Sequence, residues 1–231
     1  LYIIERMEEN GFITKEQAVA AKQEELHIRT AMSSLNTHAD YVAEMARQLM
    51  FAQYGPEIYT RGLNVYTTIR ASDQQAAYFA LRRGIMDFER RQHYRGPERF
   101  INLPEKAAEL EDAIDDALIE QGDKGDLLAA VVLEATPKKV RVMRQNSEVI
   151  EVIGEGLQPV QSGLSDKAAP NIKLRPGALV RITKTAKGGW EITQLPEVEG
   201  AFVSIDPRDG AIHALVGGFD FNKNKFNHVT Q

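Results

Sequence analysis

The sequence predicts an α+β fold in which helical segments come first, a small antiparallel β-barrel follows, and a β-hairpin lies near the last residues. Apolar residues spaced three or four apart indicate the helices. Between Asp126 and Leu195, five short alternating runs separated by turn residues are typical of a barrel or sandwich. Two further apolar runs flank Asp206-Pro207-Arg208-Asp209-Gly210 and predict the hairpin.

The composition is that of an ordinary globular chain. The 231 residues are 43% hydrophobic and 26% charged, enough for one or two hydrophobic cores. The net charge of −5 gives no electrostatic reason to expect nucleic acid or an anionic membrane surface as a partner. Cysteine is absent, which excludes disulfide and thiolate chemistry. No apolar run approaches the about 20 residues of a membrane span.

Three helices are expected in the first part of the chain. Leu1–Glu9 has the apolar spacing of a helix, and a second helix should run to about Glu25. That second helix is opened by a capping box, in which the Thr14 hydroxyl and the Gln17 side chain each bond the backbone N–H of the other residue. Ala39–Tyr54 carries an apolar stripe and ends at a Gly-Pro pair, so we expect a third helix there.

A strand and a further helix are predicted next. Leu63–Ile69 alternates β-branched and aromatic residues, which favours a strand. Ser72 and Gln75 form a second capping-box pattern, opening a helix to about Gln92. The expected buried face of that helix is Ala77, Leu81, Ile85 and Phe88. The opposite face, Arg82, Arg83, Arg90 and Arg91, is interpreted as solvated, with phosphate or carboxylate binding as the alternative.

An acidic helix should span Pro104–Gln121, with Leu110, Ile114 and Leu118 as its apolar stripe. Its acids are Glu105, Glu109, Glu111, Asp112, Asp115, Asp116 and Glu120. They lack the glycine-centred loop of a calcium site, so no metal is expected. The charge run is interpreted as a solvated face or as a docking face for a basic partner.

The barrel segment predicts five strands: Leu128–Ala135, Lys139–Met143, Glu148–Ile153, Ala178–Lys184 and Trp190–Leu195. This number and spacing of strands favour an OB-type barrel. Such barrels often bind single-stranded nucleic acid by stacking bases on aromatic side chains. Because Trp190 is the only aromatic residue between Asp126 and Pro196, the sequence argues against that function.

The hairpin strands, Ala201–Ile205 and Ala211–Val216, are apolar on both alternating faces. Strands of this kind need cover on both faces, as in the middle of a layered domain. We therefore expect the hairpin to belong to a larger domain that this chain holds only in part.

The hairpin carries a family resemblance, in the stretches GAFVSIDPRDGAIHALVGGFDF and FNHVTQ. They look like the opening of the transpeptidase domain of class A penicillin-binding proteins of the 1a type. The pattern ERMEENGFITKEQAVAAK is similar to the last helices of the family's glycosyltransferase domain, and residues 41–68 resemble its interdomain connector. The resemblance implies four segments: glycosyltransferase helices (1–35), linker (36–96), acidic helix with OB-like domain (97–198), and a truncated transpeptidase hairpin (199–231).

The family's transpeptidase nucleophile is the serine of an S-x-x-K motif. None of the serines has a lysine three residues later: Ser33, Ser34, Ser72, Ser147, Ser162, Ser165 and Ser204. Ser34-Leu35-Asn36 and Lys184-Thr185-Ala186 are interpreted as chance likenesses to S-x-N and K-T-G. The resemblance puts the nucleophile after Gln231 and the glycosyltransferase glutamates before Leu1. The five histidines show no zinc spacing. No catalytic, cofactor-binding or metal-binding residue is therefore predicted in the chain.

The resemblance implies a parent protein at the periplasmic face of the inner membrane, anchored by a helix before Leu1. That parent would polymerise a lipid-linked disaccharide precursor into glycan strands and cross-link their peptides, the step that β-lactams block. We expect this chain to be its non-catalytic middle, with the OB-like segment docking a regulator such as an outer-membrane lipoprotein activator. The alternative is a stand-alone binding or scaffold protein with an OB-like domain.

Overall fold

The computed structural model describes residues 2–23 and 37–231, which fall into two compact units divided after Asn36. The first unit holds helices α1 (Tyr2–Glu9) and α2 (Lys15–Gln23). The backbone N–H of Thr14 donates to Gln17 Oε1 (2.9 Å), and that of Gln17 donates to Thr14 Oγ1 (3.3 Å), so the predicted capping box is confirmed. The predicted continuation of this helix to Glu25 lies outside the described residues.

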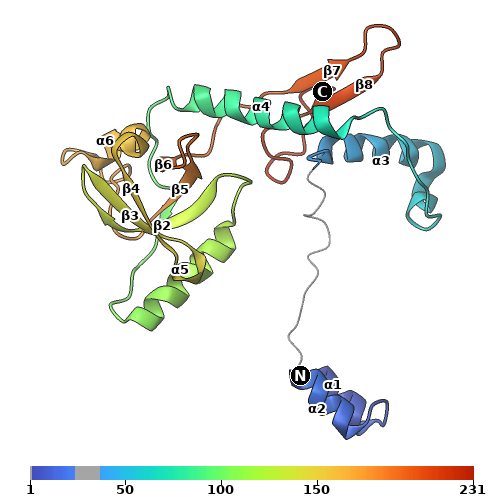
Figure 1. The fold of residues 1–231 in the computed structure, drawn as a ribbon, viewed down its shortest axis with the longest axis horizontal. Coiled ribbons are helices and arrows are strands. Elements are labelled where there is room, and N and C mark those ends of the chain that lie inside the picture. Colours follow the sequence, from blue (N-terminus) through green and yellow to red (C-terminus); the bar gives the residue numbers. More distant parts are fainter. Residues whose placement is uncertain (1, 24–36) are drawn as a thin grey trace. The chain divides into compact units, whose positions relative to one another are not determined.

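The second unit contains a six-stranded antiparallel sheet that curves into a barrel (Figure 1). Its strands are β1 (Arg99–Phe100), β2 (Leu128–Ala135), β3 (Lys139–Met143), β4 (Val149–Ile153), β5 (Ala178–Lys184) and β6 (Trp190–Thr193). They follow the order β1-β5-β2-β3-β4, with β6 also paired to β5. The predicted bounds of β2, β3 and β5 are confirmed, and only the two-residue β1 was not foreseen.

Inward-facing residues of the strands form the barrel core. The fully buried members include Ala130, Val132, Val140, Val142, Val152, Ile182 and Ile192. The passage after β4, for which the sequence indicated no element, contains the 3₁₀ helix η3 (Gly154–Val160) and the short helix α6 (Gln161–Leu164). Their buried side chains Leu157, Val160 and Leu164 belong to the same core. The passage between β4 and β5 therefore contributes to the interior of the barrel.

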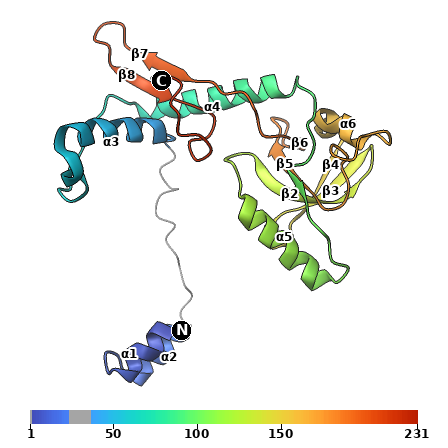
Figure 2. The ribbon, with the colours of Figure 1, turned by 180° about the vertical axis from the view of Figure 1, so that it is seen from behind.

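Helix α5 (Ala107–Gln121) packs on the outside of the barrel, beside β2 (Figure 2). Ile114 and Leu118 are buried there against Ala129 and Val131 of β2, as the predicted stripe requires. Gly122 ends the helix with a φ of +61°, a left-handed conformation that favours glycine. The acids of the helix lie on its remaining, solvent-facing side.

Helices α3 (Asp40–Tyr54) and α4 (Ala71–Glu89) precede the barrel, with the 3₁₀ helix η1 (Gly55–Tyr59) after α3. The predicted strand at Leu63–Ile69 is wrong: the segment pairs with no described strand, and Thr68 Oγ1 donates to the Ile212 carbonyl of β8 (2.7 Å) without a ladder. The predicted Ser72 cap is also wrong. The helix begins one residue earlier, at Ala71, and the Ser72 hydroxyl donates to Asp73 instead.

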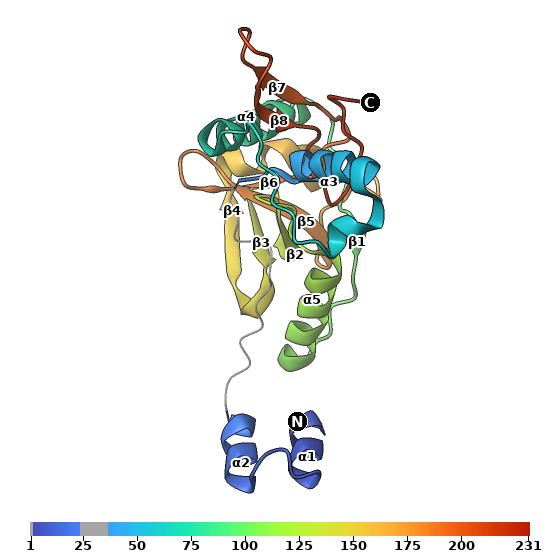
Figure 3. The ribbon, with the colours of Figure 1, turned by 90° about the vertical axis from the view of Figure 1, so that its right-hand side faces the viewer.

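The predicted hairpin is confirmed as β7 (Phe202–Ile205) paired with β8 (Ile212–Val216). Gly210 has a φ of +77°, the left-handed value that the turn was expected to need. Helices α4 and α3 both lie against β8 (Figure 3). The last three residues of β8 are buried, whereas Phe202, Val203 and Ile205 of β7 are exposed. The described residues thus cover only part of the hairpin.

A search of the described helices finds none with the length and apolar character needed to span a membrane.

Candidate functional site at the junction of helix α4 and the barrel

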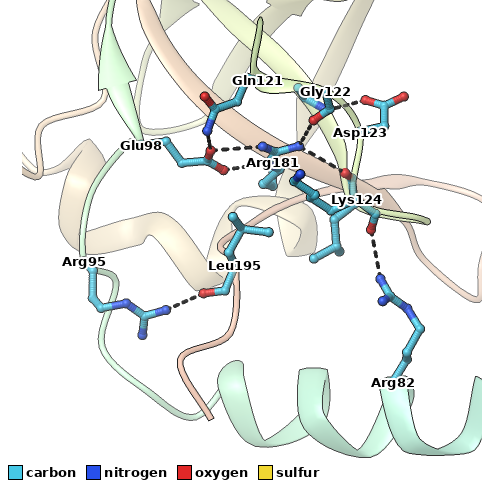
Figure 4. Close-up of polar contacts among 11 residues, drawn as sticks. Arg82, Arg95, Glu98, Gln121, Gly122, Asp123, Lys124, Arg181 and Leu195 are labelled. Atoms are coloured by element: carbon cyan, nitrogen blue, oxygen red, sulfur yellow. Dashed lines mark hydrogen bonds and ion pairs between the residues drawn. The ribbon is translucent and has the colours of Figure 1, made fainter. Parts of the chain in front are cut away.

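Residues 122–127, the entry loop, connect α5 to β2, the first long strand of the barrel. Arginines from three different elements hold this loop: Arg82 of α4, Arg181 of β5, and Arg144 just after β3. Figure 4 shows the contact of Arg82 with Lys124 and those of Arg181 with Glu98 and Gly122. Because each arginine reaches the loop from a different element, the loop is the point where helix and barrel are joined.

Arg181 is almost fully buried, with 1% of its surface exposed. Its guanidinium makes a two-point ion pair with Glu98, at 2.5 Å from Nε to Oε1 and 3.0 Å from Nη2 to Oε2. A third donor, Nη1, bonds the carbonyl of Gly122 (2.6 Å), the first residue of the entry loop (Figure 4). A buried charge is tolerated when it is paired and hydrogen-bonded in this way.

Arg82 corrects the expectation of a solvated arginine face on α4, because only 4% of it is exposed. Its guanidinium bonds the Asp126 carboxylate, and Nη2 also donates to the Lys124 carbonyl (2.9 Å). Nη1 donates to the Phe219 carbonyl (2.8 Å), beyond the hairpin. The guanidinium carbon lies 3.9 Å from the centre of the Phe219 ring, a cation–π geometry.

Two residues of the entry loop allow this close approach. Gly125 has a φ of +67°, and a Cβ there would lie 3.2 Å from Nη2 of Arg82, so the position favours glycine on both counts. Asp123 accepts the Ala129 N–H through Oδ1 (2.8 Å) and Arg144 Nη2 through Oδ2 (2.8 Å). The loop is thus shaped by its own sequence as well as by the arginines.

The chain leaves the barrel close to the C-terminal end of α4, where a second set of contacts holds it. Arg95 donates through Nη2 to the Leu195 carbonyl (2.6 Å) and pairs with Glu89, which is 2% exposed (2.6 Å). Gln194 bonds Glu89 as well (2.7 Å). Helix α4 therefore contacts the barrel both where the chain enters and where it leaves.

Apolar side chains fill the space between these two sets of contacts. The buried members are Ile85 and Met86 of α4, Leu127 of the entry loop, and Phe219 beyond the hairpin, with Leu81, Leu195 and Val198 partly buried around them. Helix α4, the entry loop and the segment beyond the hairpin thus contribute to one small shared core. A cluster of this kind keeps water away from the Arg82 bonds and strengthens them.

Beside the junction lies an open cleft of about 1020 Å³ between α4 and the barrel. Its walls carry both signs of charge, from residues that include Arg83, Asp87, Glu151, Lys184 and Glu191. Lys184-Thr185-Ala186, the K-T-G likeness, lies at one edge of this cleft. The Thr185 hydroxyl accepts the Gly189 N–H (3.1 Å) and is engaged in the β5–β6 turn. The S-x-N likeness lies outside the described residues.

Within the described ranges, no three His, Asp or Glu side chains are arranged to hold a metal ion. Asp112, Asp115 and Asp116 lie on the solvent side of α5. The expectation that the chain holds no catalytic residue stays a prediction. Sequence reasoning missed Arg181 and Glu98, although the lone arginine inside the apolar run ALVRITK was a signal for a buried, paired charge.

The OB-like segment and the chain as a whole are similar to known proteins. Residues 94–198 match the family model described as the penicillin-binding protein OB-like domain. Penicillin-binding protein 1A of Neisseria lactamica is 36% identical over the whole chain, which covers 29% of that relative, and that of Escherichia coli is 33% identical over 99% of the chain, covering 28%. The crystal structure of penicillin-binding protein 1A from Haemophilus influenzae matches the whole chain and 33% of its own, with a TM-score of 0.79 and 29% identity.

The barrel is therefore an OB-like domain of the penicillin-binding protein type. Over its whole length the chain is similar to a region of penicillin-binding protein 1A, in agreement with the class A resemblance in its hairpin. It spans less than a third of the length of the curated relatives described above. The division into four segments at residues 35, 96 and 198 stays a prediction.

Proposed function

We propose that this chain is the non-catalytic middle region of a bifunctional peptidoglycan synthase. The parent protein polymerises a lipid-linked disaccharide precursor into glycan strands, and it cross-links their peptides through an acyl-serine intermediate that β-lactams intercept. It works at the periplasmic face of the inner membrane. Similarity to penicillin-binding protein 1A over the whole chain supports this proposal, and a stop codon directly after residue 231 in the gene would overturn it.

The two edges of the hairpin support a place for it in a larger transpeptidase domain. The outer edge of β8 is closed by Gln74, whose side chain accepts the Leu215 N–H (2.8 Å) and donates to the Leu215 carbonyl (2.8 Å). The outer edge of β7 pairs with no described strand, and its side chains are exposed and apolar. An apolar edge of this kind normally pairs with further strands.

For the OB-like domain we propose an interaction role, docking a regulator of the synthase. The observation that carries it is the outer face of α5, where Glu111, Asp112, Asp115 and Asp116 make no ion pair with any described residue. By contrast, Glu109 and Glu120 on the same helix pair with Lys106 and Arg99. Ile119, which is 69% exposed, lies among the unpaired acids.

An apolar side chain surrounded by unpaired acids suits a partner with a basic surface and a small apolar contact. Complementary charge of this kind steers association and selects the partner. An outer-membrane lipoprotein activator with such a surface is the partner that we propose. Nucleic acid is disfavoured, since it would be repelled by the same face.

Charge reversal on α5 tests this role. The variant Asp112→Lys/Asp115→Lys/Asp116→Lys should bind the purified activator at least about tenfold more weakly than the unmodified chain, as measured by surface plasmon resonance. The matched control is Glu151→Lys/Glu155→Lys/Asp166→Lys, which changes the net charge equally at exposed positions of β4 and of the passage after it. Binding by the control should be unchanged.

Two results would contradict the proposal. One is equal binding by both triple variants, which would mean that net charge and not the α5 face governs association. The other is full binding by a parent protein from which residues 97–196 have been deleted. The first result would remove the α5 face as the docking surface, and the second would remove the OB-like domain as the docking module; both leave the synthase assignment intact.

A further inference from the structure

One side chain, Arg82, contacts two segments that are far apart in the sequence. The first is the entry loop, at Lys124 and Asp126. The second is the post-hairpin segment, residues 217–221, at the Phe219 carbonyl. The guanidinium is planar and its donors are fixed relative to one another, so it cannot follow one partner without turning away from the other.

Burial makes these bonds hard to replace. Arg82 is almost fully enclosed, with Phe219 beneath it and the Tyr78 ring 5.4 Å away. If the guanidinium turned away, the carbonyls of Lys124 and Phe219 would each lose a charged donor in a place that water reaches poorly. The cost of such a loss is that of a hydrogen bond to a charged group.

Two other polar contacts of this region do not reach the entry loop. The Phe219 N–H donates to Glu199 (3.1 Å), and the Lys223 ammonium donates to the Pro196 carbonyl (3.1 Å). Both lead to the chain leaving the barrel, not to the entry loop. Among the hydrogen bonds of the described residues, those of Arg82 alone join the entry loop to residues 217–221.

We propose that Arg82 couples the entry loop of the barrel to the post-hairpin segment, so that opening of either one destabilises the other. The coupling is a property of the fold and holds whether or not the barrel docks a regulator. If the barrel does so, a disturbance of the entry loop has a direct route to the β7–β8 hairpin. Such a route is a coupling free energy between two sites, and it is reciprocal.

Amide hydrogen exchange on the 231-residue chain tests the coupling from the barrel side. Asp126→Ala removes one partner of Arg82 at a residue whose own side chain is about half exposed, so little else changes. We expect exchange about tenfold faster both in residues 122–127 and in residues 217–221, which Asp126 does not touch. Unchanged exchange in β2 and β3 shows that the barrel stays folded.

The second arm removes the coupling residue. In an Arg82→Met background, which keeps the apolar stem, both segments should exchange faster, and adding Asp126→Ala should have no further effect on residues 217–221. Arg83→Ala, an exposed arginine on the same helix, is the matched control and should leave both segments as they are. Arg82→Lys keeps the charge but not the fork, and it replaces the Met variant should that one fail to fold.

Two outcomes overturn the proposal. If Asp126→Ala accelerates the entry loop alone, the two segments open independently. If it accelerates residues 217–221 equally with and without Arg82, the coupling runs through another group, such as the shared apolar cluster. Neither outcome bears on activator binding at α5, so this proposal and the proposed function can fail separately.

Discussion

The barrel and the β7–β8 hairpin are built from similar apolar, alternating strands, yet they differ in how they cover them. The barrel curves a six-stranded sheet around a core that Leu157, Val160 and Leu164 of its own intervening passage complete. The hairpin has only two strands, and its described cover comes from helices earlier in the chain, through Ala77 and Gln74 among others. A sheet of three or more strands with an apolar face can be stable alone, whereas a two-stranded one needs packing against other elements.

The barrel and the hairpin are also stabilised by different kinds of contact. The barrel is stabilised mainly by apolar burial, so truncating a side chain at its centre leaves a destabilising cavity. Docking of the hairpin combines a small apolar cluster, in which Ala77 of α4 packs on Ala214 and Val216 of β8, with a few buried hydrogen bonds from α4 to the backbone of β8 and of the segment beyond it. We therefore expect mutations in the barrel and in the hairpin to differ in how much stability they remove and in how far from the mutated residue the effect extends.

The largest expected effect is in the barrel core. Ile182→Ala should lower the free energy of unfolding by about 2–5 kcal/mol, because Ile182 is fully buried and its truncation leaves a cavity. Ile205→Ala on β7, where 52% of the residue is exposed, should change it by no more than about 0.5 kcal/mol. Denaturant unfolding of both variants measures this. Equal losses would mean that β7 is as well covered as the barrel.

A smaller, local effect is expected at the hairpin. Gln74→Ala removes both bonds to Leu215 and one to the His38 carbonyl (2.9 Å), leaving buried backbone groups unpaired. Docking of β8 should weaken by about 2–3 kcal/mol, seen as faster hydrogen exchange in β8 with unchanged protection in β2 and β5. Gln75→Ala, at the exposed neighbouring position, should change neither. Protection of β8 that survives Gln74→Ala would show that apolar packing alone docks the hairpin.

The smallest effect concerns pH and the hairpin turn. The pKa of Asp206 is lowered from 3.8 to about 2, chiefly because the Arg208 side chain and its N–H donate to the carboxylate. Since the folded pKa lies below the unfolded one, the stabilisation is present above pH 4 and is lost as the pH falls through 2. The NMR shift of the Arg208 amide, which donates to the Asp206 carboxylate (2.9 Å), should move over that range, and Asp206→Asn should abolish the movement. A midpoint near 4 would contradict the lowered pKa.

Local sequence signals were sufficient to predict the structure where residues contact others that are close to them in the sequence. The Thr14 capping box, the turn at Gly210 and the bounds of β2 and β5 depend on residues a few positions apart. The errors fall where a distant partner decides. Leu63–Ile69 has strand composition but lies beside β8 without forming a ladder, and the start of α4 is set by Arg70, whose N–H bonds the carbonyl of His213 (2.9 Å).

The candidate site was the least predictable part. Arg83, Arg90 and Arg91 are exposed as predicted, whereas Arg82 was wrongly assigned to the solvated face because its partners, the entry loop and residue 219, come about 40 and 140 positions later. Helical spacing indicates which side chains share a face, but not which face another element will cover. By itself, the sequence determined the α+β class, the strands and the family resemblance, since these rest on local periodicity and motif. Only the tertiary structure decided that Arg82 and Arg181 are buried, because a charge can be buried only where distant groups meet to pair with it.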